Sequence, residues 1–274
     1  ADSNYNTIVG FEAGKAITGG DNNTLIGVHA GNDLTTGEKN TVLGTWAFAS
    51  GTSSYNTILG YSAGNAMTSG EENTIIGYNA GDALTTAQYN VFIGNGAGEQ
   101  ATGVGESVAI GRQAMGAAAA TGDDNVAVGY RSMYDVTTGY ENTAVGHFSL
   151  PNITTGYANV SIGRNSMNSN SLSSRNTAVG HSALQAFTET GEMGNVGIGY
   201  GAMNSVQTGS SNVAIGYYAL KGNNSVDSDY NVAIGASALN NDNGGDKNVA
   251  IGYKAGFSNT TGTGNVFIGH LAAS

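Results

Sequence analysis

The sequence contains no cysteine, a single proline and few charged residues. Without cysteine the fold cannot depend on disulfides, and thiols give no indication of a redox compartment. Charged residues make up 11% of the chain, against roughly a quarter in an average globular domain. Yet 39% of the residues are hydrophobic and recur in fixed columns, which excludes low-complexity disorder.

Basic residues and long apolar runs are also scarce. The formal net charge of -11 argues against nucleic acid as a partner and disfavours anionic membranes. No apolar run approaches the roughly 18 residues of a membrane span, so we expect no membrane insertion. The chain has neither a starting Met nor a signal peptide, and we therefore expect a mature product or a fragment of something longer.

What the sequence does contain is one short unit, repeated from end to end. With an Asn taken as offset zero, eleven of the fifteen spacings are 17 residues, and no stretch remains for a second domain. We call each unit a coil, and predict a single repeat domain over residues 1–274. The sixteen coils start at Asn6, Asn23, Asn40, Asn56, Asn73, Asn90, Ser107, Asn125, Asn142, Asn159, Asn176, Asn195, Asn212, Asn231, Asn248 and Asn265.

Each coil begins with a strand-like segment that ends in a bend. Offset 1 is Thr or Val, offset 3 is Ile, Val or Leu, and offset 4 is Gly in all sixteen coils. Thr-Thr-Gly often closes the coil, as at Thr35–Gly37, where Gly suits a tight turn. No 3.6-residue apolar period survives the glycines. The sequence therefore predicts an all-β parallel β-solenoid, with the recurring Asn side chains hydrogen-bonded from coil to coil.

In two further columns, at offsets 2 and 8, a large side chain in one column accompanies a small residue in the other. Most early coils pair a large residue at offset 2 with Gly at offset 8, and coils seven to fourteen reverse the order. Two columns that trade volume fill one shared space. The side chain at offset 2 points to the opposite side of the strand from those at offsets 1 and 3. If the side chains at offsets 1 and 3 fill the interior of the coil, the columns at offsets 2 and 8 therefore lie outside it.

An apolar seam along the outside needs a cover, and the simplest cover is other copies of the same chain. We therefore predict a homo-oligomer. Its predicted intersubunit seam consists of Ile8, Leu25, Ile58, Ile75, Phe92, Met115, Met133, Leu150, Met167, Leu184, Met203, Leu220 and Leu239.

The unit N-x-x-[IV]-G-x-x-[AS], as in Asn212–Gly216, resembles the head repeats of trimeric autotransporter adhesins. The 17-residue form with Thr-Thr-Gly looks even more like repeats of phage tail fibres. The resemblance implies a left-handed β-roll, a homotrimer, and an extracellular place on a virion or cell surface. Such fibres often carry an endosialidase-type chaperone that cuts itself off after a serine, and the chain's end at Ser274 is compatible with such a cut.

The chemical motifs do not point to an enzyme. Gly60–Gly64 reads G-Y-S-A-G, but Ser62 occupies a variable offset and the strand-to-helix context of a nucleophile elbow is missing. Three of the four histidines share offset 5, many coils apart, so we interpret them as surface residues and expect no metal or other cofactor.

Acidic residues cluster just before the Asn of many coils. Stacked carboxylates could bind Ca²⁺, but a solvated acidic edge that opposes lateral aggregation is the preferred interpretation. The residues are Asp21, Glu38, Glu71, Glu72, Glu106, Asp123, Asp124, Glu141, Asp229 and Asp246.

Aromatic residues provide the candidate receptor contacts. A Tyr column at offset 5 predicts a cross-coil ladder, although aromatic faces with polar tips could also bind a glycan or protein. Irregular coils, including the loops 185–194 and 221–230, are further recognition candidates. The candidate contacts are Trp46, Phe48, Tyr61, Tyr78, Tyr130, Phe187, Tyr200, Tyr217 and Tyr253.

The expected function is that of a structural or adhesive segment of an extracellular trimeric fibre, acting through avidity on a host glycan or protein receptor. Two alternatives stay open. Thr columns motivate an ice-binding solenoid, and exposed strand edges at uncapped coils motivate a self-assembling filament.

Overall fold

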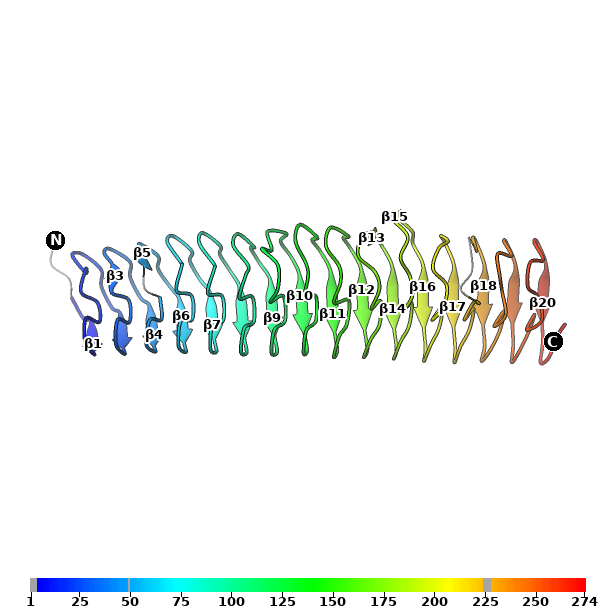
Figure 1. The fold of residues 1–274 in the computed structure, drawn as a ribbon, viewed down its shortest axis with the longest axis horizontal. Helices are drawn as coiled ribbons and strands as arrows, with labels where there is room; N and C mark the ends of the chain where they lie inside the picture. The colour runs from blue at the N-terminus through cyan, green and yellow to red at the C-terminus, as the bar shows by residue number, and fades with distance from the viewer. Residues whose placement is uncertain (1–3, 49, 224–227) are drawn as a thin grey trace. The chain divides into compact units, whose positions relative to one another are not determined.

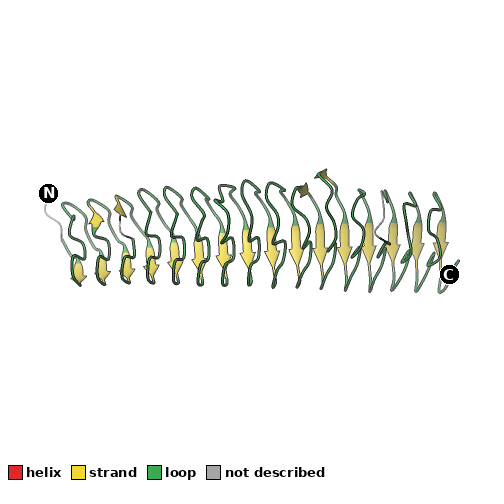
Figure 2. Ribbon diagram, viewed as in Figure 1, coloured by secondary structure: helices red, strands yellow, loops and turns green. Residues whose placement is uncertain are grey.

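The computed structural model describes residues 4–48, 50–223 and 228–274. In these residues the protein is an all-β parallel solenoid, with one three-residue main strand per coil and no helix (Figure 2). The predicted fold class is confirmed. The chain divides into two compact units, Ala1–Thr138 and Gly139–Ser274, which are described separately; a single domain over the whole chain stays a prediction.

In the first unit the described main strands pair in the order of the chain. They are β1 (Thr7–Val9), β2 (Thr24–Ile26), β4 (Thr41–Leu43), β6 (Thr57–Leu59), β7 (Thr74–Ile76), β8 (Val91–Ile93), β9 (Val108–Ile110) and β10 (Val126–Val128), with the short β3 (Asp33–Leu34) and β5 (Ser50–Gly51) forming a second pair.

The second unit repeats this arrangement. Its main strands are β11 (Thr143–Val145), β12 (Val160–Ile162), β14 (Thr177–Val179), β16 (Val196–Ile198), β17 (Val213–Ile215), β18 (Val232–Ile234), β19 (Val249–Ile251) and β20 (Val266–Ile268), and its short pair is β13 (Ser173–Ser174) with β15 (Gly191–Glu192). Within each unit the main strands run side by side in one direction (Figure 1), and equal offsets face each other in the register.

The predicted Asn ladder is present and joins successive coils. The backbone N–H of Asn73 donates to Oδ1 of Asn56 at 3.0 Å, and Nδ2 of Asn73 donates to the same oxygen at 3.1 Å. Nδ2 also donates to the carbonyl of Ala87 at the far end of its own coil, at 2.9 Å. Each buried amide thus closes one coil and links it to the coil before, which satisfies polar groups that would be costly to bury alone.

The glycine at offset 4 is required by the close approach of neighbouring coils. At Gly94, φ is 137°, and a Cβ built there would lie 2.6 Å from the carbonyl oxygen of Gly111. The two coils cannot separate at this point, since the N–H groups of Gly94 and Gly111 each donate to the preceding coil at 2.8 Å. A side chain is therefore excluded at this offset.

After the glycine, the chain turns through two left-handed residues, at offsets 6 and 8. Gln113 and Met115 have φ of 58° and 50°, a conformation that costs a residue with a Cβ about 1 kcal/mol or more. Each gains a hydrogen bond between coils: the N–H of Gln113 donates to Asn95 and that of Met115 to Ser132. These N–H groups point in opposite directions along the stack, so the turn links every inner coil to both neighbours.

The side chains at offsets 2 and 8 form the core of a single chain, which corrects the predicted intersubunit seam. The volume exchange is real: a Cβ on Gly197 at offset 2 would collide with the Leu184 side chain at offset 8. But these side chains lie inside the coil and are at most 1% exposed, with Ile8 of the first coil as the exception; the buried ones are Leu25, Ile58, Ile75, Phe92, Met115, Met133, Leu150, Met167, Leu184, Met203, Leu220 and Leu239.

The physical reason is that the interior of a narrow coil has a fixed cross-section. A large residue at one interior position must be compensated by a small one opposite. Offset 3, which is large in every coil, would overfill that space and instead faces outward. Ala or Ser at offset 7 and a column at offset 11, which includes Leu34, Leu84 and Val206, complete the core. The burial of offset 11 was not predicted from the sequence.

Replacing Gly94 with Ala should destabilise the first unit by about 4 kcal/mol or more, because the added methyl meets backbone that cannot move. Gly194→Ala is the control: this glycine also has positive φ, 64°, but among the described residues no heavy atom lies within 4 Å of the added Cβ. We expect it to cost about 1 kcal/mol. Urea unfolding followed by circular dichroism measures both; equal losses would contradict the close-approach argument.

Removing one amide of the ladder should cost about 2–4 kcal/mol, because Asn73→Ala leaves the N–H of Asn90 and the carbonyl of Ala87 without their partner. Asn73→Ser should cost less. At Ser107 a serine already occupies the ladder, and its Oγ accepts from the N–H of Asn125 at 3.1 Å. The same unfolding assay compares the two, and a serine variant as unstable as the alanine variant would refute this role of the ladder.

Candidate functional site

The outer sheet face of each unit carries a series of exposed apolar side chains. It consists of the side chains at offsets 1 and 3 of the main strands, which point away from the core. Thr or Val stands at offset 1 and an aliphatic residue at offset 3, in register from strand to strand. Several offset-3 side chains remain 36–42% exposed, namely Leu43, Leu59, Ile110, Ile162, Ile198, Ile215 and Ile251. Soluble proteins rarely leave large contiguous apolar patches uncovered.

The tyrosine column at offset 5 forms the predicted ladder. Tyr61 stacks on Tyr78 with ring centroids 5.5 Å apart and planes within 10°. In the second unit His181, Tyr200 and Tyr217 form a continuous stack, with centroids 5.1 and 5.5 Å apart. Inside such a stack the ring faces are covered by neighbouring rungs, so a ligand meets ring edges and hydroxyl groups.

The remaining tyrosines of the offset-5 column also contact an aromatic or cationic side chain. The Tyr253 ring stacks on His270, with centroids 5.4 Å apart. Tyr130 has two guanidinium groups near its ring, those of Arg112 and Arg131, each 5.4 Å from the ring centroid. All the tyrosines at offset 5 except the half-buried Tyr130 are exposed. Their role as receptor contacts stays a prediction.

For two of the candidate residues, the prediction of a receptor contact is wrong. Phe48 and Phe187 are fully buried, because they occupy the core columns at offsets 8 and 11. Their side chains cannot meet a receptor while the coils are intact. Trp46, by contrast, is 40% exposed and stacks on His29 with ring centroids 4.0 Å apart.

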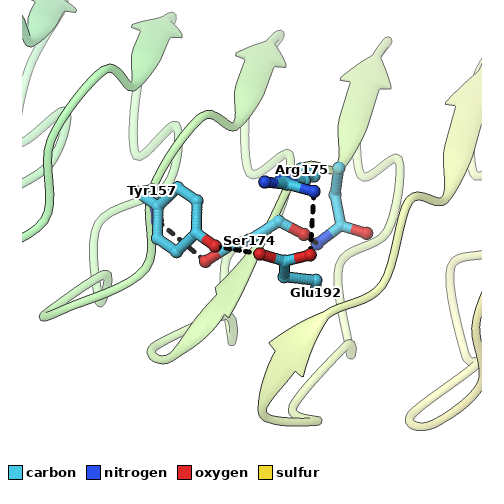
Figure 3. A network of polar contacts seen from close by, with 5 residues as sticks. Tyr157, Ser174, Arg175 and Glu192 are labelled. Atoms are coloured by element: carbon cyan, nitrogen blue, oxygen red, sulfur yellow. Dashed lines mark hydrogen bonds and ion pairs between the residues drawn. The ribbon is translucent and has the colours of Figure 1, made fainter.

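The insertion at residues 185–194 is tied to the solenoid. Its strand β15 pairs with β13, and Glu192 bridges two neighbouring coils (Figure 3). The Glu192 carboxylate accepts from the Tyr157 hydroxyl and pairs with Nη1 of Arg175 at 2.8 Å. The Tyr157 N–H donates to Oγ of Ser174 at 3.0 Å. In the other insertion, Lys221–Tyr230, residues 224–227 lie outside the described residues.

Several residues of the acidic edge have a structural role. The carboxylates of Asp21, Asp123 and Asp229 each accept a hydrogen bond from the backbone N–H of the preceding coil, with a donor–acceptor distance of 2.6 Å. Ser174 takes this role at the same offset. Within the described ranges, no group of three His, Asp or Glu residues is arranged to hold a metal ion.

Three histidines are dispersed along the offset-5 column, as expected, and His29 stands at offset 6. His29, His181 and His270 each stack on an aromatic ring, and His147 meets Phe148 edge-on. Ser62, the serine of the G-Y-S-A-G motif, is the offset-6 residue of its coil and has φ of 51°. It therefore belongs to the left-handed turn that every coil makes, with no helix following it.

Asp242 is a buried acid that was not predicted from the sequence. It occupies offset 11 of the core and is fully buried. Its Oδ2 accepts from the Ser228 hydroxyl at 2.5 Å, while Oδ1 has no side-chain or backbone partner among the described residues that meets hydrogen-bond geometry. Burial raises the pKa of this carboxyl to about 6. Asn170, which stands at the same offset and accepts from the Ser173 N–H at 3.1 Å, was the available sequence signal for a polar residue here.

The stability of the second unit should fall as the pH rises from about 4 to about 6. Asp242 has a folded-state pKa of about 6 against 3.8 for the free residue, so the folded state holds the proton more tightly and loses this advantage on ionisation. The two pKa values imply a loss of about 3 kcal/mol. Asp242→Asn should remove this pH dependence and raise stability at pH 7.

Chemical unfolding between pH 3.5 and pH 7.5 checks this expectation. Glu141→Gln serves as the control, because it removes an exposed carboxylate of the acidic edge and leaves in place both Asp242 and Asp246, the charged group that also raises its pKa. An unchanged slope in the Asp242→Asn variant would show that other groups produce the pH dependence.

A scan against models of protein families finds no match to this chain, and a search of curated proteins finds no relative. In the part of the chain that the structure describes, no helix has the length and apolar character to cross a membrane.

Proposed function

We propose that this chain is a structural and adhesive segment of an extracellular fibre, in which three copies pack through their outer sheet faces. The observation that supports the proposal is the exposed, aliphatic outer sheet face of each unit. Covering such a face removes apolar surface from water, which stabilises an assembly by roughly 25 cal/mol per Å² before the costs of association.

A second copy of the chain is the best-matched partner for this face. Its offset-1 and offset-3 columns recur at the same strand spacing, so ridges and grooves of two copies can remain in step over many coils. The surface of an unrelated globular partner would be complementary to only a few of these coils. The number three comes from the resemblance of the repeat to trimeric fibre proteins, where three faces close around one axis.

A fibre of this kind acts by holding many weak binding sites at fixed positions. Each coil adds a copy of the same exposed columns, and weak contacts to a host glycan or protein are strengthened when many sites share one rigid support. In this proposal the chain has no catalytic role and no cofactor. It belongs on a virion or cell surface, as part of a phage tail fibre or a bacterial adhesin.

Sedimentation equilibrium tests the assembly. The wild-type chain should have three times the monomer mass of 27.6 kDa. The double variant Ile198→Lys, Ile215→Lys should weaken the assembly about 100-fold or more, because it buries two unpaired charges in the interface. Tyr230→Lys is the control, since it adds a lysine at an exposed offset where Lys39 and Lys247 occur naturally. A wild-type monomer at all concentrations would overturn the proposal.

A second candidate function, ice binding, is favoured by one specific feature. Five successive coils of the first unit place threonine at offset 1 in register, at Thr7, Thr24, Thr41, Thr57 and Thr74. Later coils mostly carry valine there, which interrupts the hydroxyl array. Thermal hysteresis by a monomeric chain would favour ice binding, whereas a mass that grows without limit with concentration would favour a filament.

A further inference from the structure

The aromatic column of the second unit has one missing rung. Tyr217 and Tyr253 stand at offset 5, two coils apart, and the coil between them has Ala236 at this offset. The far face of Tyr217 is covered by Tyr200, and the far face of Tyr253 by His270. Their other faces are directed at the coil of Ala236. Elsewhere in the described column no other small residue has an aromatic ring on both sides.

The width of this gap is fixed by the backbone. The N–H of Ser237 donates to the carbonyl of Tyr217 at 2.8 Å, and the N–H of Lys254 donates to the carbonyl of Ala236 at 2.9 Å. The three coils therefore keep the same spacing as those that carry stacked rings. Since rings on adjacent coils lie 5.1–5.5 Å apart, a flat ring above Ala236 would stack on both tyrosines at the separation of the ladder itself.

The surroundings of the gap favour an anion with polar groups. Tyr217 and Tyr253 are 56% and 46% exposed, so the gap opens to solvent. Lys254 Nζ lies 5.5 Å from the Tyr253 ring centroid, beside the gap. At offsets 5 to 10, the coils of the second unit carry no Asp or Glu. In a chain with a net charge of -11, this side of the second unit is locally basic.

We propose that Tyr217 and Tyr253, on either side of Ala236, bind one six-membered sugar ring that carries a carboxylate. The C–H groups on the two faces of the ring contact the two aromatic faces, and Lys254 attracts the carboxylate. A single site of this kind is open and weak, since the described residues enclose no pocket. The inference rests on the recognition role in the proposed function, but it does not require the three-chain assembly.

Titration with methyl glucuronide, and with methyl glucoside as its neutral counterpart, tests the site. The carbon-13-labelled methyl group of Ala236, at the floor of the gap, reports the ligand through its chemical shift. We expect glucuronide to bind about tenfold more tightly than glucoside, and Lys254→Gln to remove this preference while glucoside still binds.

The decisive variant is Ala236→Tyr, which fills the gap with the ladder's own residue. It should reduce glucuronide binding at least about tenfold without loss of thermal stability, because a tyrosine here extends an existing stack. Tyrosine fluorescence and calorimetry replace the Ala236 methyl signal in this variant. Asn95→Tyr, which adds a tyrosine at offset 5 next to Tyr78, is the matched control and should leave binding unchanged.

Glucuronide binding that persists in Ala236→Tyr would overturn the proposal, as would the absence of any shift in the wild-type protein at millimolar ligand. The mass of each sample is measured by sedimentation in the same buffer. A monomer that binds glucuronide would refute the three-chain fibre and support the site, whereas a trimer that does not bind would refute the site alone.

Discussion

The structure depends on the hydrogen bonds that keep each coil at a fixed distance from the next. Backbone groups of the main strands, the left-handed turns and the Asn amides all bond along the stack, so they set one common spacing. The other features follow from it. The spacing brings glycine backbones into contact at offset 4, places the tyrosine rings at stacking distance, and limits the volume in which the side chains at offsets 2 and 8 must fit.

The repeat itself made much of the fold predictable. A period of 17 residues in most coils, a β-forming segment and a glycine in every coil are compatible with few architectures, and the recurring Asn at the start of nearly every coil predicted the ladder. Which side of a three-residue strand faces inward was harder to predict, because offsets 1, 2 and 3 are all apolar in many coils. The exchange of size between Ile75 and Gly81, or between Ala214 and Leu220, was the available signal. Volume must be conserved where space is enclosed, but not on an open face.

The candidate site was predicted only in part. The tyrosine ladder follows from the regularity of its column, so Tyr61 on Tyr78 could be expected. Phe48 and Phe187 looked like exceptions and therefore like recognition residues, yet both fill core positions whose columns vary in composition. Asp242 escaped notice because offset 11 contains Leu, Val, Phe, Asn and Asp in different coils. A column of mixed composition can be identified as buried only when its neighbours are known.

The equivalence of the coils has a consequence for how such a molecule can change in length. The contact between one inner coil and the next repeats the contact between that coil and the one before, from the glycine approach to the Asn amide. Removing or duplicating one repeat of 17 residues would join two surfaces that already fit, whereas a shift of a few residues would misalign every column at once. The length of a unit can thus vary in whole steps of about 4.8 Å, and duplication of a coil would lengthen the unit without any redesign of its core.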